Sequence, residues 1–324
     1  MALVRYWRRK YAFRLAALLV SVVLTFAIIE IALRLLGMMY DSRIYRAAQA
    51  PTDATHFVLA VGDSHTYGVG AKSGLDYPSQ LQALLNDQRP CDRYRVVNLG
   101  HAGYNSSQTV NDAQAYMDEN RSPPEIVIFN AGRNNDHNFT DARIIPEEHR
   151  FRGVRGVLRH LLSESRAHRF GQITVSRLKS LLETKLDGDQ WPNMTINGFG
   201  EHEQAFLAEW VGQDLGLLRR RCARAGAKLV LLNYYSASAA WVNDAFRRFS
   251  TTPETAVVDV RGFGRPKIET LVYLKKYVAR DGHPNAEGYA AIARMVHDEL
   301  ARRGWIAPAS CETPLTPPSP ASAP

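Results

Sequence analysis

Two periodic patterns of apolar residues alternate along most of this 324-residue chain. Five short apolar runs, rich in Val, Ile and Leu and too short for helices, predict buried strands. They cover residues 57–61, 95–99, 126–130, 228–233 and 256–260. Helical spacing predicts helices over residues 77–86, 108–119, 203–224, 239–249 and 286–303. Strands that alternate with helices predict one doubly wound domain whose mainly parallel sheet is covered on both faces.

A different pattern occupies the amino terminus. Residues 15–29 carry no charge, and the apolar pattern continues to residue 39 around Glu30 and Arg34. At about 1.5 Å per residue, a helix over residues 15–39 is long enough to cross a hydrocarbon layer of about 30 Å. Glu30 and Arg34 are spaced to pair on one helix face, near the far interface where charges cost least. We therefore expect a single transmembrane signal-anchor helix.

The flanks of this helix predict its orientation. The leader, residues 1–14, is basic, and the positive-inside rule keeps such a leader in the cytoplasm. The sequence therefore predicts a single-pass protein of the cytoplasmic (inner) membrane, with its domain on the extracytoplasmic, periplasmic side. A cleaved signal peptide is the alternative, but its apolar region would be unusually long. Its one small-residue cleavage site, residues 48–50, also precedes Pro51.

Composition divides the rest of the chain. Residues 40–55 are polar and predict a linker, and residues 56–306 predict the folded domain. Within the domain, residues 139–200 lose the regular pattern and predict a variable helical insert or lid. Apolar residues at helical spacing there are flanked by arginines. This pattern is typical of a solvated outer helix, of a helix on a membrane surface, or of a helix that binds a charged substrate. Residues 307–324, rich in Pro, Ser and Ala, predict a disordered tail.

Charge and cysteine content exclude some functions. The net charge of +8 is largely explained by the leader and the insert, and no zinc-finger or RNA-binding signature accompanies it, so we expect no nucleic-acid partner. Cys91, Cys222 and Cys311 lack metal-ligand spacing. An exported location permits one disulfide among them, without indicating which pair forms.

Candidate chemistry lies just beyond the predicted strands. Ser64 follows the first strand, Gly103 and Asn105 the second, and Asn134 the third, while His283 lies in the loop region after the fifth. Because parallel strands end at one edge of the sheet, these residues can meet in one crevice. Taken singly, each residue has a plainer explanation as a helix cap or turn residue.

Together these residues have complementary chemistry. Ser64 is a nucleophile if a base takes its proton, and His283 suits that role. Asp281 can hold the other imidazole nitrogen. Backbone N–H groups of Ser64 and Gly103 and the side-chain amide of Asn134 can form an oxyanion hole, each donor contributing about 3 kcal/mol. This set predicts acyl transfer through a serine.

Four blocks of the sequence resemble the SGNH, or GDSL-like, hydrolase family. They are residues 62–68 (GDSHTYG), 98–106 (NLGHAGYNS), 132–134 (GRN) and 281–285 (DGHPN) with Gly288. The resemblance implies a three-layer, flavodoxin-like α/β/α sandwich that hydrolyses carboxylic esters through an acyl-serine without a metal or cofactor. Similar membrane-anchored bacterial proteins imply an esterase or deacylase of acylated envelope glycans or lipids. An O-acyltransferase shares the first half-reaction and stays open.

The chain departs from the family pattern twice. Asn135 stands where the third block usually has Asp, and Asp281 and His283 are one residue closer than in the common Asp-x-x-His spacing. Residues that are two positions apart in an extended segment point to the same side, so a pair of Asp281 and His283 stays feasible. Because of these departures, a catalytically inactive binding protein with the same fold is a second hypothesis. The basic insert suggests a third, an extracytoplasmic scaffold.

Five further residues are candidates for substrate contact, because they flank the predicted site. They are His65, Tyr67, Tyr104, Asn105 and Arg133. The acyl group, the alcohol and the oligomeric state have no signature in the sequence.

Overall fold

The computed structural model covers the whole chain, and the description here is confined to fourteen stretches of it. They are residues 2–48, 53–88, 92–120, 122–136, 138–144, 162, 165–168, 170–171, 174–175, 201–235, 239–249, 252–261, 276–279 and 282–306. The predicted tail, most of the predicted insert, Cys91, Cys311 and Asp281 lie outside these residues. Cys222 lies within them as a buried free thiol, and burial raises its pKa to about 12.

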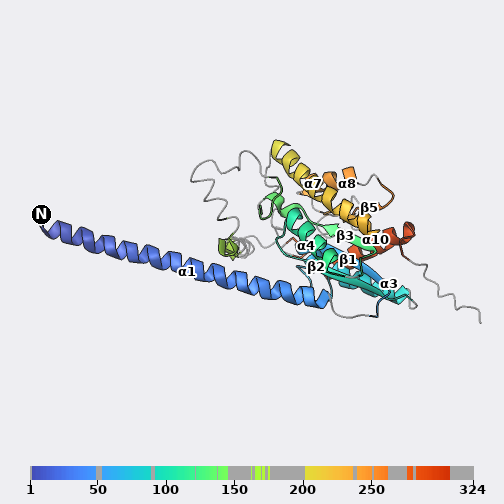
Figure 1. Ribbon diagram of the computed structural model, residues 1–324, viewed down its shortest axis with the longest axis horizontal. Helices are drawn as coiled ribbons and strands as arrows, with labels where there is room; N and C mark the ends of the chain where they lie inside the picture. The colour runs from blue at the N-terminus through green and yellow to red at the C-terminus, as the bar shows by residue number, and fades with distance from the viewer. Residues whose placement is uncertain are drawn as a thin grey trace, which may run out of the picture.

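Five parallel strands form the centre of the domain (Figure 1). They are β1 (His56–Gly62), β2 (Tyr94–Gly100), β3 (Ile126–Asn130), β4 (Lys228–Leu232) and β5 (Thr255–Val258). Their order in the sheet is β2-β1-β3-β4-β5, and every neighbouring pair is parallel. The predicted parallel five-stranded sheet is therefore confirmed.

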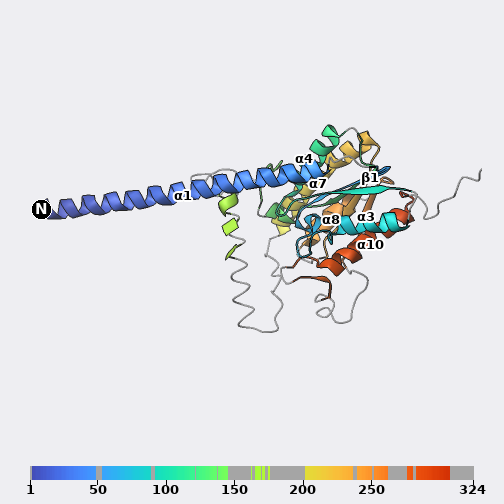
Figure 2. The same cartoon turned by 90° about the horizontal axis from the view of Figure 1, so that it is seen from below.

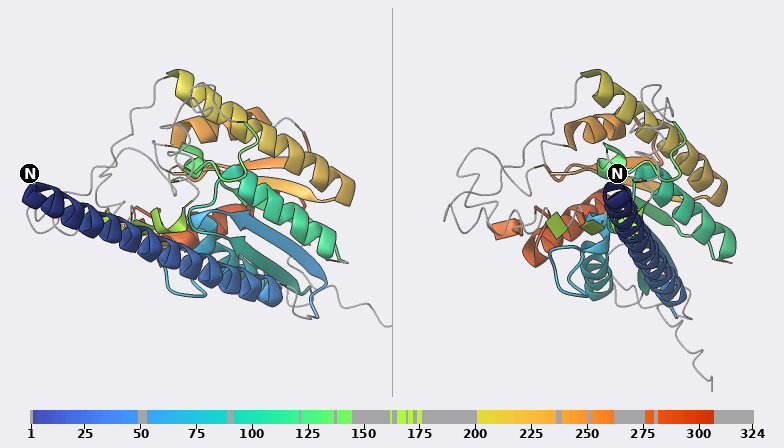
Figure 3. Two further views of the ribbon diagram at one scale, coloured as in Figure 1. Left: turned by 60° about the vertical axis from the view of Figure 1, so that its left-hand side comes forward. Right: turned by 90° about the vertical axis from the view of Figure 1, so that its left-hand side faces the viewer.

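Helices cover both faces of the sheet, as the alternation of the pattern predicts. Leu59 and Val61 of β1 point into one core with α4 (Ser106–Glu119), α7 (Glu201–Ala225) and α8 (Ala240–Phe249). Val58 and Ala60 point into the other core with α3 (Tyr77–Gln88) and α10 (Ala286–Arg302). Because successive strand residues face opposite ways, nearly every position of a central strand must be apolar. The three layers are visible in Figure 3.

The amino-terminal helix is longer than predicted. α1 runs from Ala2 to Ala48, so it includes the basic leader and the first half of the predicted linker. The predicted linker from residue 40 is therefore helical in its first part, since residues 41–48 contain no glycine or proline to end the helix. Residues Tyr11–Met39 are apolar and long enough to cross a membrane, and none of their most apolar window is buried in the protein. Figures 1 and 2 show α1 projecting far beyond the domain.

Candidate active site

Ser64 stands on a tight turn at the end of β1. Asp63 caps the one-turn helix α2 (Ser64–Tyr67), and its carboxylate accepts the N–H of His65 at 3.0 Å. Gly62 lies so close to its neighbours that a Cβ there would be 2.4 Å from the carbonyl oxygen of Asn130. At the first position of α2, the N–H of Ser64 has no acceptor within the helix. The turn therefore presents a hydroxyl beside a backbone donor that the helix itself does not use.

His283 meets Ser64 across 219 positions of sequence. Its Nε2 lies 2.8 Å from Ser64 Oγ. The loop that carries His283 begins at an isolated bridge between Val278 and Pro284, and Tyr235 donates its hydroxyl to the carbonyl of Gly282. The imidazole is thus held in hydrogen-bond contact with the serine by contacts on both sides of the loop.

Gly70 lets the two loops approach this closely. Its φ is +95°, and a Cβ there would lie 2.6 Å from the carbonyl oxygen of Pro284 and 3.2 Å from the Cβ of His283. Beside it, the hydroxyl of Tyr289 on α10 donates to the carbonyl of Val69 at 2.8 Å. A side chain at position 70 would push the His283 loop away from Ser64.

The loops after β2 and β3 are tied to one another. Gly103 has a φ of +82°, and its carbonyl accepts a hydrogen bond from Asn138 at 2.7 Å. Asn134, in the short 3-10 helix η1 (Arg133–Asp136), donates one amide hydrogen to the carbonyl of Tyr104 at 2.9 Å. An amide nitrogen has two hydrogens, so the second is available to another acceptor.

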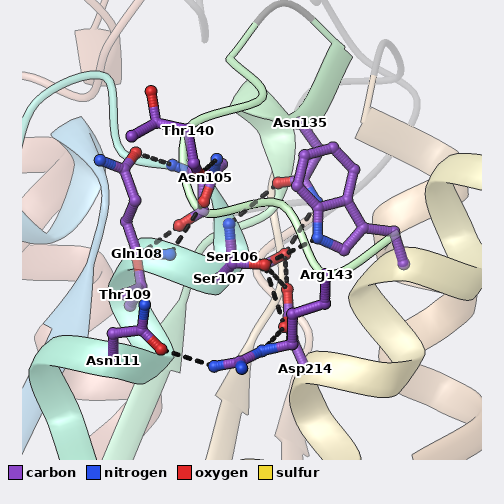
Figure 4. Close-up of polar contacts among 11 residues, drawn as sticks. Asn105, Ser106, Ser107, Gln108, Thr109, Asn111, Asn135, Thr140, Arg143 and Asp214 are labelled. Carbon is purple, nitrogen blue, oxygen red and sulfur yellow. Dashed lines mark hydrogen bonds and ion pairs between the residues drawn. The ribbon is translucent and has the colours of Figure 1, made fainter. Parts of the chain in front are cut away.

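Asn105 has a different position from the one expected. It is completely buried and caps α4 by accepting the N–H of Gln108 at 2.9 Å. Its amide donates to the carbonyl of Asn138 at 2.8 Å and to that of Thr140 at 2.7 Å. Figure 4 shows Asn105 beside Thr140 and Gln108. With every polar atom bonded and no exposed surface, Asn105 braces the loop instead of contacting substrate. The expectation of substrate contact is corrected accordingly.

Asn135, the departure from the family pattern noted in the sequence, also braces this region. Its carbonyl oxygen accepts the N–H of Ser106 at 2.9 Å, and its amide donates to Ser106 Oγ at 2.7 Å. A carboxylate could make only the first of these bonds, because it has no hydrogen to donate. The Asn therefore suits a serine hydroxyl whose own hydrogen goes elsewhere.

That hydrogen goes to Asp214, a residue that the sequence analysis missed. Asp214 is completely buried on α7 and accepts hydrogen bonds from Ser106 Oγ at 2.5 Å, Ser107 Oγ at 2.8 Å and Arg143 Nε at 2.8 Å (Figure 4). Trp210 donates its indole N–H to Ser107 Oγ at 2.8 Å. Burial raises the pKa of Asp214, although its hydrogen bonds and Arg143 oppose this. The available signal was a carboxylate on the apolar stripe of a predicted helix.

A second buried group lies under the Ser64 turn. Tyr234 donates its hydroxyl to the carboxylate of Asp63 at 2.5 Å, and burial raises the pKa of Tyr234 well above its ordinary value. The ring of His65 lies edge-on to Tyr234, with centroids 5.0 Å apart, and 5.1 Å from the ring of His283. Tyr234 and Tyr235 had no distinctive spacing in the sequence, and only the fold brings them to the site.

The remaining candidates surround the site in different ways. Tyr67 is 40% exposed, while Tyr104 stacks on the ring of His101 with centroids 4.5 Å apart. Arg133 pairs with Asp136, the residue after Asn135. These side chains are therefore held at or near the surface of the loops that carry Ser64, Gly103 and Asn134.

A parallel sheet with this order, covered by helices on both faces, defines a three-layer α/β/α protein, and the contact between Ser64 and His283 lies at the carboxyl edge of its sheet. Residues 60–291 match the family model described as GDSL-like Lipase/Acylhydrolase family. The chain belongs to this family of ester hydrolases. The match spans the domain from β1 into α10, and it includes both Ser64 and His283.

The chain is also similar to solved structures. A lipase, Lip_vut3, from a goat rumen metagenome is 14% identical, with 75% of this chain and 97% of that chain covered and a TM-score of 0.46. TesA is 17% identical, with 76% and 99% covered and a TM-score of 0.46. AlinE4, an SGNH-hydrolase family esterase, is 14% identical, with 78% and 98% covered and a TM-score of 0.39. No curated protein matches the sequence.

The close approach at Gly70 yields a matched pair of substitutions. Gly70→Ala is expected to lower kcat/KM for ester hydrolysis about 10- to 100-fold, because the added Cβ displaces His283 from Ser64. Gly74→Ala is the control, since Gly74 also has a positive φ, +81°, but no atom within 4 Å of its Cβ position. Equal activity losses in the two variants would show that backbone strain alone is responsible.

The Asp214 network is expected to contribute strongly to stability. Asp214→Ala leaves buried hydroxyl groups and Arg143 without their acceptor, and should lower the free energy of unfolding by about 2–4 kcal/mol. The control is Asp118→Ala, whose 67% exposed carboxylate pairs with Arg221 at the surface and should cost less than about 1 kcal/mol. Thermal unfolding of the detergent-solubilised chain measures both, and similar losses would contradict the assignment.

His65 is expected to make the domain sensitive to mild acid. Burial lowers its pKa below the ordinary value of about 6.5, with Asp63 opposing and His283 and Arg133 adding to the shift. Neutral His65 therefore contributes to the free energy of unfolding above about pH 6.5. This contribution is lost as pH falls through the lowered pKa, because the unfolded chain binds the proton more readily. Between about pH 7 and 5, the unfolding temperature of His65→Gln should fall less than that of the parent chain. An unchanged slope, equal to that of His56→Gln, would refute this.

Proposed function

We propose that this protein is a membrane-anchored serine esterase in which Ser64 is the nucleophile and His283 the general base. The contact of 2.8 Å between Ser64 Oγ and His283 Nε2 is the observation that carries the proposal. Membership of the GDSL-like lipase and acylhydrolase family supports the reaction class. Asp281 is proposed to hold Nδ1 of the imidazole, as its place two residues before His283 suggests.

In the first half-reaction, His283 Nε2 takes the proton of Ser64 as Oγ bonds to the acyl carbon of the ester. The carbonyl oxygen becomes an oxyanion, for which the N–H groups of Ser64 and Gly103 and the amide of Asn134 are the proposed donors. The ester C–O bond then breaks, and the alcohol leaves with the proton from His283. The acyl group stays on Ser64.

In the second half-reaction, His283 takes a proton from water as the water oxygen bonds to the acyl carbon. The same donors hold the second oxyanion, and Ser64 Oγ leaves with the proton that His283 returns. The products are a carboxylic acid and the original enzyme. If a sugar hydroxyl replaces water, the same steps give acyl transfer, which is the alternative function.

The proposed location is the outer side of a cytoplasmic membrane, with α1 as the anchor. The support is the apolar stretch Tyr11–Met39 and the basic residues before it. The proposed substrates are acylated glycans or lipids of the cell envelope, for which Tyr67, Tyr104 and Arg133 supply aromatic and cationic contacts near Ser64. A screen of acetylated glycans, with and without an acceptor sugar, distinguishes hydrolysis from transfer.

The catalytic assignment is tested on p-nitrophenyl acetate. Ser64→Ala and His283→Ala are each expected to lower kcat at least about 10⁴-fold, because each removes a group that acts in both half-reactions. His56→Ala is the control, since His56 lies at the opposite end of β1, where it bonds Glu125 at 2.9 Å. An organophosphonate should label the parent chain but not Ser64→Ala. Full activity in either catalytic variant would overturn the mechanism.

A further inference from the structure

One face of the apolar part of α1 is in contact with the rest of the protein. Between Tyr11 and Met39, Glu30, Leu33 and Gly37 are partly buried, whereas the other residues of this stretch are exposed. Residues spaced by three and four lie on the same side of a helix. A short strip on one side of α1 therefore marks where other residues cover its apolar part.

The strip is covered by residues 165–168, which come from the predicted insert. The carboxylate of Glu30 accepts hydrogen bonds from Ser165 Oγ at 2.8 Å and from the N–H groups of Arg166 at 3.2 Å and Ala167 at 2.9 Å. Arg34 donates to the same carboxylate at 2.6 Å. Glu30 therefore caps a helical turn of the insert, and every charge at this level of α1 is paired.

Gly37 allows the insert to lie directly against α1. Arg166 extends along the helix and donates to the carbonyl of Leu33 at 3.3 Å. A Cβ at Gly37 would lie only 1.3 Å from Arg166 Nη1. Glu30 and Gly37 thus contact the insert at points about two helical turns apart, which fixes both the side of α1 that the insert covers and its position along the helix.

The position of Glu30 along α1 matches the edge of a bilayer. From Tyr11 to Ile29 every residue is exposed, and this stretch is about 28 Å long at about 1.5 Å per residue. That length is close to the hydrocarbon thickness of about 30 Å, while Tyr11–Met39, at about 43 Å, matches a bilayer with its headgroup layers. Glu30 then lies where hydrocarbon gives way to headgroups, a depth at which a charged residue costs far less than at the centre.

The insert carries apolar side chains at the same place. Phe170 is 58% exposed and Val175 is 64% exposed. Outside α1 these are the most exposed large apolar side chains of the described residues. Apolar groups beside basic residues such as Arg166 are typical of segments that lie in a membrane interface.

We propose that a docking segment of the insert, residues 165–168, 170–171 and 174–175, lies on the bilayer surface beside α1. Glu30 holds this docking segment at the level of the headgroups, and Phe170 and Val175 reach toward the acyl chains. Figures 1 and 2 show the segment next to α1, partway along its length. The occupant of this surface is lipid, because the surface continues directly from the apolar length of α1. The inference rests on the proposed anchoring by α1 and is independent of the proposed catalysis.

The docking segment also orients the active site. Figure 3 shows the strand arrows pointing toward the side from which the amino-terminal half of α1 projects. Ser64 follows the carboxyl end of β1, so its loop faces the same side as the docking segment. The edge that carries Ser64 and His283 thereby faces the bilayer, which favours ester groups presented at the membrane surface.

The test measures the depth of single labelled positions in the full chain. In a background with Cys91→Ser and Cys311→Ser, which keeps the buried Cys222, a fluorophore is attached to Phe170→Cys, Val175→Cys or Glu119→Cys. The chains are placed in phosphatidylcholine–phosphatidylglycerol vesicles that contain lipids with a quenching nitroxide. Quenching at positions 170 and 175 should be at least about threefold that at position 119, the exposed last residue of α4. Equal quenching at all three positions would overturn the proposal.

Glu30 is tested with a matched neighbour. Glu30→Ala should reduce quenching at position 170 about twofold, because it releases the docking segment, whereas Ile29→Ala, at an exposed position, should not. Hydrolysis of p-nitrophenyl acetate in detergent should be the same in both variants. Repeating the quenching with Ser64→Ala separates the two proposals, because docking must persist without activity. Unchanged quenching in Glu30→Ala would exclude the role of Glu30.

Discussion

The hydrogen bond between His283 and Ser64 depends on the direction of the strands. Because all five strands are parallel, their carboxyl ends share one edge, and residues separated by 219 positions meet at 2.8 Å. Such a contact needs very close backbones, which explains why Gly70 faces the His283 loop. The contact also needs fixed loops, which the hydroxyl groups of Tyr235 and Tyr289 provide. Ser64 and His283 are thus positioned by hydrogen bonds that hold each of their loops.

Two buried carboxylates support the loops at this edge from below. Asp63 accepts a hydrogen bond from the hydroxyl of Tyr234, and Asp214 accepts hydrogen bonds from Ser106, Ser107 and Arg143. A buried carboxylate is costly unless its lone pairs are all used, so each of these groups strongly favours one arrangement of its neighbours. Asp214 joins α7 to the start of α4, directly after the loop of Gly103. The stability of the helical layer and the shape of the proposed oxyanion hole are therefore linked.

α1 is in contact with the rest of the protein along one side. It continues as a helix to Ala48, well past its apolar stretch, and residues 41–48 contain no glycine or proline. Glu30 binds the insert through the N–H groups of Arg166 and Ala167. The proposed membrane docking depends on this side contact, which gives α1 and this part of the insert one relative arrangement.

The sequence by itself determined the five strands, the helices between them, and Ser64 and His283 as partners, because burial in a parallel sheet imposes continuous apolar runs and strand ends collect polar loops. It also determined the pair of Glu30 and Arg34, which depends only on helical spacing. Only the tertiary structure decided that Asn105 is a buried brace, that Asp214 and Tyr234 support the site, and that Glu30 caps a turn of the insert. These contacts join residues far apart in the chain, and local periodicity carries no record of which distant groups will satisfy a buried hydrogen bond.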